Sequence, residues 1–155
     1  MKEMSKRVLP LLVWVAWSLS SCTEGRLYEN FYAFEDKIWA ETDTAKFDIS
    51  GLKTKAGKSL IAVKYSENYP FSNCYIRVIE RDSSKSEVQS RLLNVPIFQS
   101  KSGQPLGEGF GNTFTKYDTL PFQLSDKTRE VVLVQYMRQA ELNGIEAVGL
   151  KIVAR

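Results

Sequence analysis

One cysteine near the N-terminus, Cys22, has a residue type and a position that could support covalent chemistry. It follows Leu19-Ser20-Ser21, and small residues before a cysteine suit the narrow pocket of a signal peptidase. A basic start and the short apolar run 8–17 precede it, which is typical of a secretory signal. The cysteine thiolate can carry a diacylglyceryl group, and the amine freed by cleavage can take a third acyl chain. The sequence therefore predicts lipidation at Cys22.

The same pattern sets the expected domain boundaries: a lipoprotein signal peptide over 1–21, a short lipidated tether over 22–26 and one folded domain over 27–155. The apolar run of about ten residues is too short to span a bilayer, which needs roughly 20. Several acyl chains on one residue would instead hold the protein on a membrane surface. A tether of about five residues reaches at most ~18 Å, so we expect the domain to sit close to the bilayer. An ordinary cleaved signal, in which Cys22 has no role, is the alternative.

Histidine is absent from the chain, and this excludes much catalytic chemistry. Without it the chain has no Ser-His-Asp or Cys-His relay and lacks the commonest metal ligand. The second cysteine, Cys74, lies in an apolar strand pattern and is expected to be a small core residue rather than a reactive thiol. Sequence spacing fixes no carboxylate pair and shows no calcium loop; carboxylates near turns, such as Glu130, are expected on the solvated surface. We therefore expect no enzyme activity, no cofactor and no metal.

The charge balance gives no case for nucleic acid as a partner. Removing Lys2, Glu3, Lys6 and Arg7 with the signal lowers the formal net charge from +3 to +1. Binding of nucleic acid needs a clustered basic face, which this balance does not suggest. Aromatic residues are plentiful (8 Phe, 7 Tyr and 3 Trp), and this favours a packed core over a disordered chain.

Two-residue alternation of apolar and polar side chains dominates the chain after the signal. In the strand expected over 74–81 it places Cys74, Ile76 and Val78 on one face. The other expected strands cover 27–34, 46–50, 60–65, 88–95, 113–116, 121–124, 130–137 and 146–153, and a short helical turn is expected at 138–142. About eight short strands separated by turn residues predict an all-β fold, an antiparallel two-sheet β-sandwich that is jelly-roll-like.

Aromatic residues around Trp39 are the first candidates for binding. With Phe31, Tyr32 and Phe34 nearby, Trp39 could form a platform on which sugar rings stack. The same residues could equally belong to the core or pack at a sheet edge. A carbohydrate-binding jelly-roll lipoprotein is therefore one functional hypothesis, and it requires that Trp39 is exposed.

Three further segments supply the remaining candidate contacts. Tyr69 opens the run 69–73, in which Pro70 forces its neighbour to be extended. The glycine-rich loop 103–112 lacks the strand, helix and lysine of a phosphate cradle. It is better explained as a hairpin or a bulge with positive φ, in which Phe110 anchors the loop or forms an exposed contact. Gln135 and Arg138 lie at the end of a strongly apolar strand, where they either form a buried hydrogen-bonded pair or face a partner.

These pieces together resemble the GldH family of gliding-motility lipoproteins of the Bacteroidota. The resemblance covers nearly the whole mature chain in the same order. It rests on Cys22, Trp39, the runs 69–73 and 107–111, and the C-terminal segments 135–138, 142–145 and 148–150. The C-terminal segments, which read Gln-x-Met-Arg, Gly-Ile and Val-Gly-Leu, are the most specific part.

The resemblance implies a small lipid-anchored envelope protein connected with the gliding and type IX secretion machinery. It brings no catalytic residues, so the expected partners are the membrane, through Cys22, and other envelope proteins of that machinery. Export to the surface in such bacteria generally needs an acidic run after the lipidated cysteine, and here only Glu24 follows closely. We therefore expect an outer-membrane protein that faces the periplasm.

Overall fold

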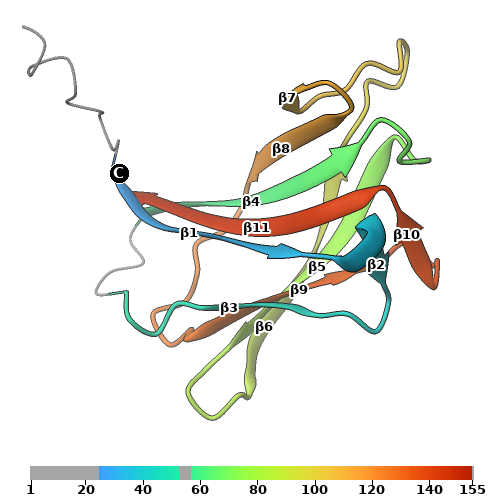
Figure 1. The fold of residues 1–155 in the computed structure, drawn as a ribbon. Helices are drawn as coiled ribbons and strands as arrows, with labels where there is room; N and C mark the ends of the chain where they lie inside the picture. The colour runs from blue at the N-terminus through green and yellow to red at the C-terminus, as the bar shows by residue number, and fades with distance from the viewer. Residues whose placement is uncertain (1–24, 53–56, 155) are drawn as a thin grey trace, which may run out of the picture.

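A computed structural model describes residues 25–52 and 57–154, which fold into a sandwich of β-sheets (Figure 1). The strands are β1 (Arg26–Ala33), β2 (Ile38–Ala40), β3 (Ala45–Asp48), β4 (Gly57–Ser66), β5 (Asn73–Arg81), β6 (Glu87–Pro96), β7 (Glu108–Phe110), β8 (Thr113–Thr119), β9 (Glu130–Gln135), β10 (Glu141–Asn143) and β11 (Ile145–Ala154). A short 3-10 turn, η2 (Glu35–Lys37), joins β1 to β2. The expected signal peptide and Cys22 lie outside the described residues. Within the described ranges, no helix has the length and apolar character needed to cross a bilayer.

The strand pairing is nested and antiparallel. β5 and β6 pair with each other as a hairpin. The strands before and after this hairpin then pair from the inside outward: β4 with β8, β3 with β9, β2 with β10 and β1 with β11. Four of these pairs fall alternately into a four-stranded sheet, β3-β9-β5-β6, and a five-stranded sheet, β1-β11-β4-β8-β7, while β2 and β10 form a small sheet of their own. This arrangement is a jelly roll, so the expected all-β sandwich is confirmed.

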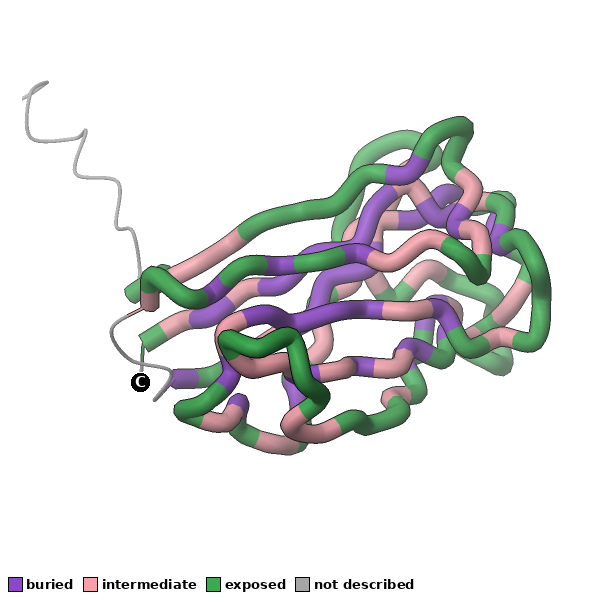
Figure 2. Tube along the Cα trace, turned by 90° about the horizontal axis from the view of Figure 1, so that it is seen from below, coloured by how far each residue is buried: buried purple, intermediate pink, exposed green. Residues whose placement is uncertain are grey.

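The core lies between the sheets, on the strand faces that the alternation predicted (Figure 2). Cys74, Ile76 and Val78 of β5 are buried. Leu150 and Ile152 of β11, in the five-stranded sheet, are buried in the same core cluster. Cys74 is fully buried and forms no disulfide, and this burial raises the pKa of its thiol to about 12. The expected core role of Cys74 is therefore confirmed. Each fully buried aliphatic side chain stabilises the fold by about 1.5–3 kcal/mol.

Several local expectations were wrong. The strands β2, β7 and β10 were not expected, because each has only three residues and is too short for alternation to register. The expected helical turn at 138–142 is a bend that leads into β10. Glu130, expected on the solvated surface, is buried, and its carboxylate lies 2.8 Å from Lys85 Nζ and 3.5 Å from Arg81 Nη1.

The segment 121–124 is not a strand, and a buried carboxylate explains its path. Glu80 is fully buried in β5, and its Oε2 accepts hydrogen bonds from the Ser125 N–H at 2.9 Å and from the Thr128 hydroxyl. The Gln89 amide donates to Oε1 of the same group. Because a buried carboxylate needs such partners, the chain after Leu120 turns inward to supply them instead of continuing the sheet.

The sandwich has two ends, which Figure 1 shows at its left and right. At the N-terminal end, β1 begins beside the end of β11, where Ala154 pairs with Gly57. At the opposite end, which we call the distal end, the Ser66 N–H donates to Gly144 O at 2.8 Å, and the Glu67 N–H donates to Asn112 O at 3.0 Å. β11 runs between the two ends over ten residues, a span of about 30 Å.

Candidate functional site

Trp39 lies in the core and cannot be a sugar-binding platform. Its side chain is fully buried, stacks on Phe34 with ring centroids 5.0 Å apart, and donates its indole N–H to Asp43 O at 3.0 Å. It also pairs across β2–β10 with the fully buried Leu142. The interaction role expected for Trp39 was therefore wrong: β10 and Phe34 cover the ring, and stacking on a ligand needs an open face.

Tyr69 is also a structural residue. It is almost fully buried, its hydroxyl donates to Asn73 O at 3.0 Å, and its ring meets Phe71 edge-on. Burial raises the pKa of Tyr69 well above its usual value. Gly144 has φ +88, and a Cβ built on it would lie 3.0 Å from the Tyr69 backbone, so this turn requires glycine. The interaction role expected for Tyr69 was wrong, because Tyr69 packs the β4–β5 connection against the turn at Gly144, just before β11.

The two polar candidates at the end of β9 and just beyond it have different roles. Gln135 is buried; its side-chain amide donates to Gln139 O at 2.6 Å and accepts from the Met137 N–H at 2.9 Å. It therefore closes the bend 136–140 rather than facing a partner. Arg138 is exposed within that bend, with φ +56. The two residues therefore do not form the buried hydrogen-bonded pair that was one alternative. Gln135 is a buried structural residue, and Arg138 lies on the surface.

Phe110 has an almost completely exposed side chain, at 98%. It ends β7, and Gly111, with φ +66, turns the chain into β8. The glycine-rich loop is therefore the hairpin that the sequence predicted, and Phe110 is its exposed contact rather than its anchor. The turn lies at the distal end, because Thr113 pairs with Ser66.

The remaining candidate site is a shallow cavity of about 400 Å³ on the outer face of the four-stranded sheet, lined by Tyr75, Leu92, Tyr136, Met137 and Arg138. We call these five residues the outer patch. Tyr75, Leu92 and Tyr136 are 37%, 50% and 48% exposed. The solvated face of an antiparallel sheet is usually polar, and a contiguous exposed apolar patch marks an interaction site.

Hydrogen bonds and ring contacts hold the outer patch in place. The Tyr136 N–H donates to Tyr75 O at 2.8 Å, and the Tyr75 N–H donates to the Met137 sulfur at 3.1 Å. The Arg77 guanidinium lies over the Tyr136 ring, 4.4 Å from its centroid. Because Gln135 fixes the bend that carries Tyr136 and Met137, the patch is a preformed surface near the distal end of β5.

The charged residues at the outer patch differ from those of the five-stranded sheet. On the five-stranded sheet, the hydrogen bond from Arg26 holds the pKa of Glu29 below its usual value, and the one from Lys37 does the same for Glu146. On the four-stranded sheet, the described residues place no carboxylate within 4.0 Å of the charged nitrogens of Arg77 or Arg138. The outer patch therefore combines apolar surface with unneutralised positive charge.

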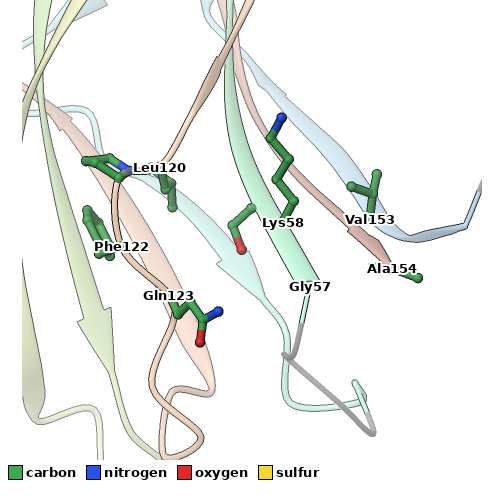
Figure 3. Close-up of a pocket in the computed structure, with 9 residues that line it drawn as sticks. Gly57, Lys58, Leu120, Phe122, Gln123, Val153 and Ala154 are labelled. Atoms are coloured by element: carbon green, nitrogen blue, oxygen red, sulfur yellow. The ribbon is translucent and has the colours of Figure 1, made fainter.

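A second cavity, of about 590 Å³, lies at the N-terminal end (Figure 3). Its lining includes Gly57, Lys58, Leu120, Phe122, Val153 and Ala154. The lining also includes Ser59, Pro121 and Gln123, and Lys58 is its one charged side chain, so the cavity has no acid–base pair. Among the residues described, no group of His, Cys, Asp and Glu side chains is arranged to hold a metal ion.

Sequence reasoning identified Arg138 but missed most of the outer patch. For Tyr75 and Arg77, the alternation indicates only that they lie opposite the buried face of β5. The sequence did contain one signal for the patch. In 130–137, apolar residues occur on both faces of the expected strand, whereas a strand that is covered on one face needs apolar residues on that face only. Leu92 gave no such signal, since its neighbours in the patch come from other strands.

Comparison with known proteins gives a family match and several distant structural likenesses. The family described as GldH lipoprotein matches residues 26–152 of the chain. No curated protein matches it. Among solved structures, the PRD1 vertex protein P5 has a TM-score of 0.41 at 12% identity and covers 85% of this chain and 99% of its own. The infectious bursal disease virus VP2 subviral particle has a TM-score of 0.31 at 11% identity and covers 81% of this chain and 30% of its own.

Proposed function

The chain belongs to the GldH lipoprotein family, and we propose that it acts as a non-enzymatic, lipid-anchored docking component of the gliding and type IX secretion machinery. The outer patch carries this proposal. It offers exposed tyrosine, leucine and arginine side chains beside the partly buried Met137, and most of these types are enriched in protein interfaces. It is also preformed, so a partner would lose little energy in ordering it.

The position of the patch fits a protein anchored at Cys22. β1 begins at Arg26, four residues after that cysteine, so the tether of about five residues reaches at most ~18 Å. The N-terminal end of the sandwich then rests near the bilayer. The outer patch and Phe110 lie toward the other end, about 30 Å along the strands. Both surfaces are thereby presented to proteins beyond the membrane surface rather than to the lipid.

Replacement of Tyr136 by serine tests this proposal. Tyr136→Ser should reduce recovery of gliding and secretion proteins by at least tenfold, because truncating a central interface residue costs about 2 kcal/mol or more. Affinity purification after detergent solubilisation measures recovery, and a secretion assay measures the consequence. Tyr32→Ser is the matched control, because Tyr32 is 41% exposed on the other sheet, and it should leave recovery unchanged. Normal recovery and normal secretion with both Tyr136→Ser and Leu92→Asp would refute the proposal.

For the side of the membrane, we propose the periplasmic face of the outer membrane. The support is the short sequence after Cys22, in which Glu24 is the only acidic residue before β1. Protease added to intact cells should leave the protein whole, and the same protease should degrade it once the outer membrane is permeabilised. Digestion in intact cells would place the domain on the cell surface.

A further inference from the structure

β6 is an edge strand that exposes a long row of backbone groups. It spans ten residues, Glu87–Pro96, and forms the border of the four-stranded sheet with β5 as its one paired neighbour. No hydrogen bond to the backbone of residues 90–94 comes from any described residue outside β5. Edge strands are usually protected by charged side chains, above all lysine, by an internal proline or by a covering loop. The charged residues of β6 are Glu87, at its first position, and Arg91; the strand has no lysine, and its one proline stands at its end.

The register shows which backbone groups point outward. The Tyr136 N–H donates to Tyr75 O, so the backbone of Tyr75 faces β9 and the backbone of Ile76 faces β6. Ile76 pairs with Leu93, whose N–H and C=O therefore point to β5. In an antiparallel strand the orientation alternates, so Ser90, Leu92 and Asn94 direct their N–H and C=O groups to the open edge.

The same alternation sets which side chains an added strand would meet. Leu92 lies opposite Arg77 on the outer face and lines the outer patch. A residue paired with Leu92 would lie on that face too and extend the apolar surface of the patch. The next residue of the added strand would lie beside Arg91. The Arg91 guanidinium lies 5.3 Å from the centroid of the Phe122 ring, and among the described residues it has no carboxylate within 4.0 Å.

From this geometry we propose that the β6 edge binds an extended segment of a partner protein by strand addition, with apolar residues at alternate positions and an acidic residue between them. The proposal rests on the docking function above and names how the partner is held. Backbone hydrogen bonds from Ser90, Leu92 and Asn94 supply the ladder, and side-chain pockets beside Leu92 supply selectivity. Arg91, which lies beside the acidic position, favours an acidic residue there over a basic one, and Arg77 and Arg138 add positive charge on the outer face of the sheet.

A peptide probe tests the proposal on the full-length lipoprotein in detergent. The probe is a blocked peptide of alternating valine and aspartate, long enough to span β6, and fluorescence anisotropy measures its binding. We expect saturable binding that is lost when every second amide of the peptide is N-methylated, because that change removes the ladder. Lysine in place of aspartate should weaken binding at least tenfold. Equal binding of the methylated peptide, or no binding by the unmodified one, would overturn the proposal.

Ser90→Pro is the matching protein variant. Proline removes an N–H that points to solvent and leaves the bonds to β5 intact, so the fold should survive. Ser90→Pro should weaken peptide binding at least tenfold, whereas Ser90→Ala should bind as the wild type does; Ser90→Lys serves the same purpose if the proline variant does not fold. If the wild type is a dimer and Ser90→Pro is a monomer, the strand added to β6 comes from a second copy of the chain. That outcome would reject a segment of a partner protein as the occupant.

The two proposals can fail separately. If Ser90→Pro retains the gliding and secretion proteins while Tyr136→Ser loses them, strand addition is wrong and the docking function stands. If both variants retain these proteins, both proposals are wrong. Loss with both variants, together with the peptide result, supports strand addition beside the outer patch.

Discussion

Trp39→Ala should lower the free energy of unfolding by about 3–5 kcal/mol, the cost of truncating a large buried aromatic side chain. The indole is fully buried, stacks on Phe34 and donates to Asp43 O, so its removal leaves a cavity between β2 and the main sandwich. A single domain has about 5–15 kcal/mol of stability in total, and the loss should lower the melting temperature by more than about 10 °C. Urea unfolding, followed by circular dichroism, measures the change in the free energy of unfolding.

Trp39→Phe is the control for this result. Phenylalanine keeps the aromatic contact with Phe34 and loses the hydrogen bond to Asp43 O, so it should cost clearly less than alanine. A loss below about 1 kcal/mol for Trp39→Ala would contradict the buried position. Retained stability with loss of binding to a glycan would revive the carbohydrate hypothesis.

Cys22→Ala should move the protein from the membrane fraction to the soluble fraction. Each buried CH2 group of an acyl chain contributes about 0.8 kcal/mol to membrane binding, and the substitution removes every chain at once. The fold should be unaffected, because β1 begins only at Arg26. We therefore expect a melting temperature close to that of the wild type and a loss of gliding or secretion, since the high local concentration near membrane partners is lost.

Cys74→Ala is the matched control, because it removes the other cysteine of the chain. Cys74 is buried in the core, so its replacement should lower stability modestly and leave the protein in the membrane fraction. Fractionation, immunoblotting and complementation at native expression compare the two variants. Full complementation by a soluble Cys22→Ala protein would show that the lipid takes no part in the mechanism.

Local sequence determined the strands with clear alternation and the character of several single residues. Cys74, Ile76 and Val78 are buried as their spacing predicted, and the glycine-rich loop is a hairpin because Gly111 can adopt a positive φ. These features depend on residues that are close together in the chain. The lipidated cysteine is of the same kind, because the signal pattern is local, and it stays a prediction since Cys22 lies outside the described residues.

Tertiary structure decided which aromatic and polar residues face a partner. Trp39 and Phe110 are both large apolar residues in short strands, yet β10 covers the first while the β7–β8 turn exposes the second. The outer patch joins Tyr75, Leu92 and the bend 136–140, which the nested pairing of β5, β6 and β9 brings together. A two-residue period tells which side chains share a face, but whether that face is covered depends on strands distant in sequence, so only the fold could reveal the site.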